Sequence, residues 1–233
     1  IEQAIAGLNE KIADATARGA WDLDLLIGKR GQNYLNLKEY DKAIEDFTKV
    51  IEGDIVAGAN PLVGRAGAYH MLNKHDKAIE DLAKAIRVIS KDPENEEDLI
   101  EAYNSRGLAY YDAGEYDKAI RDFNKAIKLD AYIYLYYNRG CAYLDKGSLD
   151  RAIKDFTEAI DCSFDAPGDY FSHRSLAFFK KGKFDKALED LDEVIRLDPY
   201  ESNAYQLCGE IHQAIGDEDK AQANFKKAKD ILA

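Results

Sequence analysis

The chain has 233 residues, of which 46% are hydrophobic, and its 44 acidic and 32 basic side chains give a formal net charge of −12. This acidity argues against nucleic acid and anionic membranes as partners, because both select a basic surface. No apolar run approaches the roughly 20 residues that cross a bilayer, so no membrane span is expected.

The first predicted element is a helix within residues 1–20. Its segment EQAIAGLNEKI, from Glu2, aligns with DKAIEDFTKVI, from Asp41. The chain is therefore expected to open with the second helix of a half-unit. Because residue 1 is Ile and not Met, the sequence is interpreted as a fragment or a processed form.

After this helix, one short string occurs six times with a period of about 34 residues, which is typical of a stacked supersecondary unit. A second recurring segment, such as SRGLAYY from Ser105, lies upstream of each copy. Apolar residues recur at helical spacing in both segments, so each unit is predicted to be helix, turn, helix. The predicted units form a single array over 1–233 and span residues 24–57, 59–92, 100–132, 133–166, 168–201 and 202–233. The six copies of the string are YDKAIEDF at Tyr40–Phe47, HDKAIEDL at His75–Leu82, YDKAIRDF at Tyr116–Phe123, LDRAIKDF at Leu149–Phe156, FDKALEDL at Phe184–Leu191 and EDKAQANF at Glu218–Phe225.

One turn position is predicted to adopt positive φ, because four of its six occupants are Gly and one is Asn. Lys38 is the exception, and we expect a slightly strained turn there. The spacing is longest between the second and third strings, which places an insert near Ser90–Asp98, predicted to be a surface loop or an extended helix end. The turn residues are Lys38, Asn73, Gly114, Gly147, Gly182 and Gly216.

Two further positions predict how the helices of a unit meet. A small residue in the first helix allows close approach, and we expect Gly107 to face Ala119. An Arg precedes the small residue in five units, and an Asp precedes the large residue of the second helix in the same five. The sixth unit loses both together, with Cys208 and Asn224. Pairing inside each unit leaves no Arg unmatched, so we predict the pairs Arg30–Asp46, Arg65–Asp81, Arg106–Asp122, Arg139–Asp155 and Arg174–Asp190.

On these residues the chain resembles the tetratricopeptide repeat (TPR) family over roughly residues 24–233. The resemblance rests on the small residue of the first helix, the large residue three later, the Ala of each string and the large residue four beyond it. It implies an all-α, right-handed solenoid, or superhelix, of about six helix-turn-helix units plus the N-terminal helix. It also implies that first helices line a concave groove in which peptides bind.

Stepping from each small residue gives the predicted inward faces of the third to fifth units. They are rich in Tyr, Leu and Phe, which offer large contact areas, and in Asn, which can bond an extended backbone. In the third unit, Asp112 is predicted to lie on this inward face beside Tyr111. The predicted partner-binding residues are Asn104, Leu108, Tyr111, Tyr134, Tyr137, Asn138, Cys141, Leu144, His173, Leu176 and Phe179.

No catalytic or metal-binding pattern accompanies the repeats. The four His residues lack spacings such as HExxH, and no phosphate-binding glycine loop is present. No cofactor is expected. Three cysteines without a CxxC motif, Cys141, Cys162 and Cys208, favour reduced thiols and a cytoplasmic location, although a secreted form stays open.

The sequence therefore predicts a non-enzymatic scaffold or adaptor protein that binds a peptide or helix of a partner protein. Two alternatives stay open. One is a structural protein that forms homo-oligomers by stacking through the ends of the array. The other is a regulatory segment of a larger enzyme.

Overall fold

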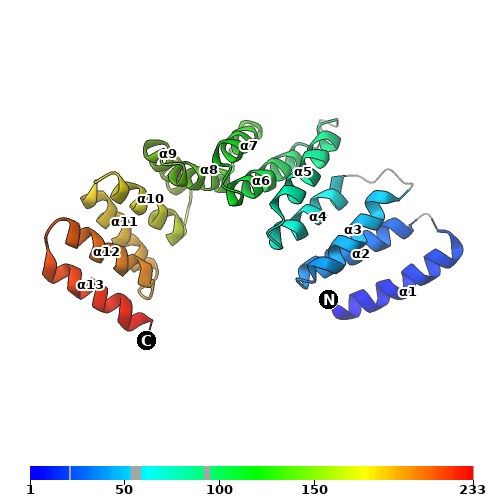
Figure 1. The fold of residues 1–233 in the computed structure, drawn as a ribbon, viewed down its shortest axis with the longest axis horizontal. Helices are drawn as coiled ribbons and strands as arrows, with labels where there is room; N and C mark the ends of the chain where they lie inside the picture. The colour runs from blue at the N-terminus through cyan, green and yellow to red at the C-terminus, as the bar shows by residue number, and fades with distance from the viewer. Residues whose placement is uncertain (21, 54–58, 92–94, 233) are drawn as a thin grey trace. The chain divides into compact units, whose positions relative to one another are not determined.

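The structure is a computed structural model that describes residues 1–20, 22–53, 59–91 and 95–232. The described chain folds into α-helices joined by short turns, with no strand in these ranges (Figure 1). None of the described helices is long and apolar enough to cross a membrane. The helices divide into two compact units, Ile1–Asp130 and Ala131–Ala233.

The first unit holds the N-terminal helix and three helix pairs. Each pair packs on itself and on its neighbour, and α4 contacts both α2 and α6. The second helices are strongly amphipathic, and their buried stripes supply most of the large core residues, such as Phe47 and Phe123. The helices are α1 (Glu2–Arg18), α2 (Leu23–Asn36), α3 (Tyr40–Glu52), α4 (Ala59–Met71), α5 (His75–Ile89), α6 (Glu96–Asp112) and α7 (Tyr116–Leu129).

The second unit repeats the arrangement with three more helix pairs. Here α10 contacts the first helices α8 and α12 on either side. The core between the last two pairs is apolar and includes Leu191, Val194, Cys208 and Ile211. The helices are α8 (Ile133–Asp145), α9 (Leu149–Asp161), α10 (Gly168–Lys180), α11 (Phe184–Leu197), α12 (Ser202–Ala214) and α13 (Glu218–Ile231).

The turn inside each helix pair has the predicted positive φ at all six positions, Lys38 and Asn73 included. Two backbone hydrogen bonds close it. In the first pair, Glu39 N–H donates to Tyr34 O over 2.9 Å, and Lys38 N–H donates to Leu35 O over 3.0 Å. This is the Schellman arrangement, in which a left-handed residue lets the chain cap the carbonyls that a helix end leaves free.

In four helix pairs the small residue of the first helix is a Gly that receives the Phe ring of its own second helix. A Cβ added at Gly107 would lie 2.6 Å from Phe123 Cε1, a distance that real structures do not tolerate. The nearest atoms all belong to Phe123, a contact that was not predicted. Gly140 and Gly209 face Phe156 and Phe225 in the same way, and a Cβ at Gly31 would lie 3.1 Å from Phe47 Cε1.

All five predicted ion pairs form inside their own helix pairs. In each, Arg Nε and Nη2 donate to the two carboxylate oxygens of Asp over 2.6–2.9 Å. The Asp side chains are buried, and a charge that is withdrawn from water persists only when it is paired and hydrogen-bonded. The bond to Asp46 raises the pKa of Arg30, and the bond to Asp81 raises that of Arg65.

The predicted insert near Ser90–Asp98 is described in part. Residues 92–94 lie outside the described ranges. Its last residues form the first turn of α6, which carries Glu96, Glu97 and Asp98, where acidic side chains complement the helix dipole.

Candidate functional site

The first unit has a hollow of about 480 Å³ on the faces of its first helices. Leu35, Val63 and Leu108 give it apolar walls, and Gln32, Asn60 and Ser105 supply polar groups. Of the second helices, only α5 contributes among the lining residues, through Leu82. The hollow is therefore built where α2, α4 and α6 lie side by side.

The helical repeat explains why these side chains share one surface. Residues one and four positions beyond a given residue lie near one face of a helix. Counted from the small residue of each first helix, these steps give Gln32 and Leu35 on α2, Gly67 and His70 on α4, and Leu108 on α6, all of which line the hollow.

Gly67 leaves open space at the wall of this hollow. A Cβ built there meets only Leu35 Cδ2, at 3.9 Å, which is an ordinary contact. The space beside Gly107, by contrast, is occupied by the Phe123 ring. The space at Gly67 can therefore take an apolar side chain, and the Gln32 and Asn60 amides can bond a polar backbone beside it.

The second unit carries an aromatic cluster on α8 and α10. The Tyr137 ring stacks on Tyr170 at 4.6 Å between centroids, and it meets His173 edge-on at 5.3 Å. His173 Nδ1 lies 2.8 Å from the Asp169 carbonyl oxygen and 3.3 Å from the Tyr137 hydroxyl. Burial raises the pKa of Tyr137, and Cys141 and Asp169 add to the shift, so this phenol stays protonated.

Beside this cluster, α10 and α12 enclose a smaller pocket of about 190 Å³. Its lining includes His173 and Leu176 from α10 and Asn203 and Leu207 from α12. An amide again lies beside apolar side chains. The stacked aromatic rings and this pocket share His173, so they form one continuous surface on the second unit.

The predicted binding residues fall into three groups. Leu108, His173 and Leu176 line the two hollows. Tyr111 and Phe179 are half-buried against aromatic residues of their own helix pairs, Tyr116 and Phe184. The others divide by burial: Tyr134, Tyr137 and Asn138 are half-buried, whereas Asn104, Cys141 and Leu144 are buried.

The buried thiols are poor nucleophiles. Burial raises the pKa of Cys141 to about 12 and that of Cys208 to about 11. Because the thiolate is the reactive form, both sulfurs are unreactive at neutral pH. Cys162 is exposed.

The sequence reasoning missed the residues of α2 and α4, since it applied the register only to the third, fourth and fifth units. The same count from Gly31 and Ala66 identifies Gln32, Leu35 and Gly67. Asn60 and Asn203 lie six residues before the small residues Ala66 and Gly209, which is the step that gives Tyr134 from Gly140. The sequence period therefore carried a signal for both amides, but it was not applied to the second and sixth units.

Protein-family models match almost the whole array. Models described as tetratricopeptide repeat match residues 26–52, 59–131, 104–170, 137–202 and 202–231. No protein with a curated description matches the chain.

Solved structures show the same fold. MamA is 27% identical, with a TM-score of 0.63, over 72% of this chain and 94% of that one. A tetratricopeptide repeat protein from Parabacteroides merdae is 22% identical, with a TM-score of 0.66, over 98% and 93%. YrrB is 23% identical, with a TM-score of 0.63, over 81% and 93%. With its repeated helix pairs matched by family models from residue 26 to residue 231, the chain belongs to the tetratricopeptide repeat family.

Proposed function

We propose that this protein is a non-catalytic scaffold that binds a peptide segment or helix of a partner protein on the faces of its first helices. The hollow on α2, α4 and α6 carries this proposal. Its volume of about 480 Å³ accommodates several side chains. Peptide-binding grooves combine such apolar pockets, which select side chains, with polar groups that bond the backbone.

Two further observations support a peptide ligand. YrrB, which shares the fold, is described as a TPR protein with an unusual peptide-binding site. The net charge of −12 favours a basic or neutral segment over an acidic one, because like charges slow encounter and weaken the complex.

On the second unit, the ligand would contact Tyr137, His173 and Leu176. Large aromatic surfaces with few rotatable bonds carry much of the energy of protein interfaces. Asn203 would orient a bound backbone there, as Gln32 and Asn60 would on the first unit. Each unit thus offers an apolar surface with an amide beside it.

The test uses two glycines that both accept a side chain. Gly67→Leu fills the hollow, whereas Gly7→Leu adds the same group on α1, where a Cβ meets nothing within 4 Å. At neither position does the added Cβ make a tight contact, and Leu is favoured over Gly in a helix. Peptides selected from a displayed random library on the whole chain provide the ligand, and calorimetry measures their affinity.

We expect Gly67→Leu to weaken the selected peptides at least tenfold and Gly7→Leu to leave them unchanged. A second variant, Tyr137→Ala, should weaken peptides that bind the second unit. The proposal would be contradicted if Gly67→Leu and Tyr137→Ala both bound the selected peptides as tightly as the wild type does. A library that yields no binder would contradict it as well.

A further inference from the structure

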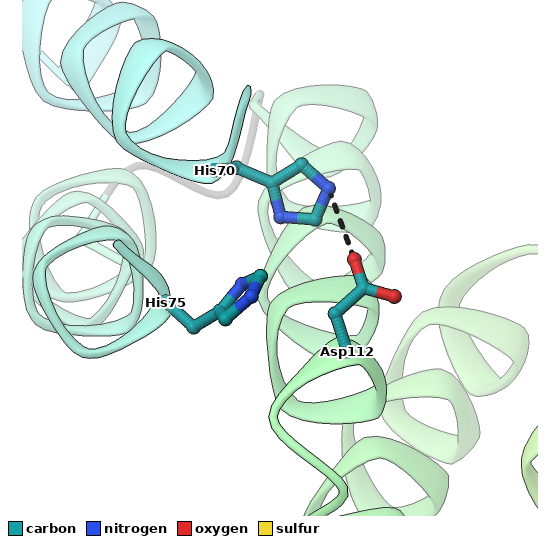
Figure 2. Close-up of side chains that lie close together, drawn as sticks. All are labelled: His70, His75 and Asp112. Atoms are coloured by element: carbon teal, nitrogen blue, oxygen red, sulfur yellow. Dashed lines mark ion pairs between the residues drawn. The ribbon is translucent and has the colours of Figure 1, made fainter. Parts of the chain in front are cut away.

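Three metal-binding side chains converge in the first unit, next to the hollow (Figure 2). His70 comes from the end of α4, His75 from the start of α5 and Asp112 from the end of α6. His70 and His75 are five residues apart, whereas Asp112 lies 37 residues beyond His75, and no spacing rule connects it to the two histidines. The fold brings them together because the turn after α4 lies beside the end of α6 (Figure 2).

Their geometry is close to that of a metal site. His70 Nε2 lies 3.3 Å from Asp112 Oδ2, and one donor atom from each residue lies within 4.8 Å of the others. Tetrahedral zinc with bonds of about 2.0–2.1 Å holds its ligand atoms about 3.4 Å apart. His70 and Asp112 already have this separation, and the donor atom of His75 lies within 4.8 Å of both.

The cluster also contains polar atoms that the protein does not satisfy. The Nδ1 atoms of both His70 and His75 are buried, and within the described residues neither has a hydrogen-bond partner. A buried ring nitrogen without a partner is costly, because it has lost its bond to water. The two rings meet edge-on with their centroids 5.7 Å apart. Because His70 faces Asp112 through Nε2, an ion between them would not use the His70 Nδ1, and the unsatisfied nitrogen that bears on the ion is that of His75.

The repeat supplies an internal control for these two positions. The residues that correspond to His70 and His75 form aromatic pairs in two other helix pairs: Tyr111 with Tyr116, and Phe179 with Phe184. Packing of the turn therefore needs only a pair of apolar or aromatic side chains. The two histidines add nitrogen donors that packing does not require, and they do so where a carboxylate of the next pair can reach them.

We propose that His70, His75 and Asp112 bind a divalent transition-metal ion, with Zn²⁺ as the preferred ion. Imidazole nitrogens with a carboxylate oxygen suit zinc, and three protein ligands leave a fourth position for water or for a donor from a bound partner. The ion would join α6 to the α4–α5 pair. Because His70 also lines the hollow, the ion would lie at its edge.

Zinc titration of the whole chain, freed of metal by chelation, tests the assignment. We expect calorimetry to show one ion per chain, and Co²⁺ to give the visible absorption of a tetrahedral site. His75→Tyr should weaken binding at least tenfold. Its fold should persist, because Tyr116 occupies the same position in the next pair. Asp112→Asn should weaken binding as well.

His212→Phe is the matched control, since His212 Nδ1 is also buried without a partner among the described residues but has no such cluster around it. It should bind zinc as the wild type does. Zinc should also raise the thermal midpoint of the wild type and of His212→Phe, but not that of His75→Tyr, because an ion that binds the native state stabilises it. The proposal is overturned if the wild type binds no zinc or if His75→Tyr binds as tightly as His212→Phe.

Discussion

Five of the helix pairs contain the buried Arg–Asp ion pair, and the last pair, α12–α13, has Cys208 and Asn224 instead. In other respects the last pair is built like the rest. Gly209 receives the Phe225 ring, and Gly216 makes the turn with positive φ. Packing and turn geometry therefore suffice to form a helix pair, and the ion pair contributes something else.

The arginines show what that contribution is. Two of them also reach back to the preceding second helix: Arg65 Nη1 donates to Thr48 over 2.9 Å, and Arg174 Nη1 donates to Thr157 over 3.2 Å. Each such Arg thus bonds the helix pair before it as well as its own. In the last pair, Cys208 instead joins the apolar cluster with Leu191. Apolar packing can replace a buried ion pair, often with little change in stability.

Breaking one ion pair should have the largest effect on stability. Its cost is compared with that of the equivalent change in the last helix pair, which has no ion pair. Asp190→Ala leaves Arg174 without its carboxylate, with side-chain exposures of 17% for Arg174 and 6% for Asp190. Removing one partner of a buried pair costs about 3–5 kcal/mol. The equivalent change in the last pair, Asn224→Ala, should cost within about 0.5 kcal/mol, as for most surface sites.

Urea unfolding followed by circular dichroism measures both variants, and hydrogen exchange locates the loss in α10 and α11. Replacing Arg174 and Asp190 together with apolar residues should recover much of the stability, because no unpaired charge then remains. Equal costs for Asp190→Ala and Asn224→Ala would mean that the ion pairs do not distinguish the two kinds of helix pair.

The next effect should be the same in both kinds of pair, because both use the contact between Gly and Phe. Gly107→Ala and Gly209→Ala each place a Cβ within 2.6 Å of a ring atom, and overpacking costs about 1–3 kcal/mol. Adding Phe123→Leu to Gly107→Ala should restore part of the loss. The chain itself uses this combination elsewhere, as Ala66 with Leu82.

Gly7→Ala is the control for helix propensity, since its Cβ meets nothing, and it should stabilise by about 0.5–1 kcal/mol. A double-mutant cycle, measured by thermal unfolding, gives the interaction free energy between the substitutions at positions 107 and 123. We expect it to be about 0.5–3 kcal/mol. Independent, additive effects would show that the ring and the glycine do not share one space.

The features that the sequence predicted well are those within one helix pair. The helices, the turn position and the pairing of Arg106 with Asp122 follow from residues that recur at a fixed spacing, since such residues occupy equivalent places in every unit. The contact of Gly107 with Phe123 was not predicted, although the sequence carries a signal. The small residue is Gly where the large residue is Phe, and it is Ala66 or Ser175 where that residue is Leu.

Features that depend on neighbouring pairs were harder to predict. Asp112 was placed on an inward face, but its contact with His70 depends on how α4 and α6 lie against each other. The bond from Arg65 to Thr48 likewise joins two pairs. The register of a single helix places a side chain on a face, and only the packing of two helices decides which side chain it meets there.

The smallest effect should come from the turn, where the first and last pairs differ in residue and agree in conformation. Lys38 has φ of 62° and Gly216 has φ of 82°. A left-handed conformation costs an ordinary residue about 1–2 kcal/mol, and part of the gain from glycine is offset by its greater freedom in the unfolded chain.

Lys38→Gly should therefore stabilise the protein by at most about 1 kcal/mol, and Gly216→Lys should destabilise it by about the same amount. Thermal unfolding of the two variants measures the expected gain in stability of the first and the expected loss in the second. A loss of stability in Lys38→Gly would show that the Lys38 side chain makes a contribution larger than the strain of its backbone. The first and last turns would then be held by different interactions despite their common geometry.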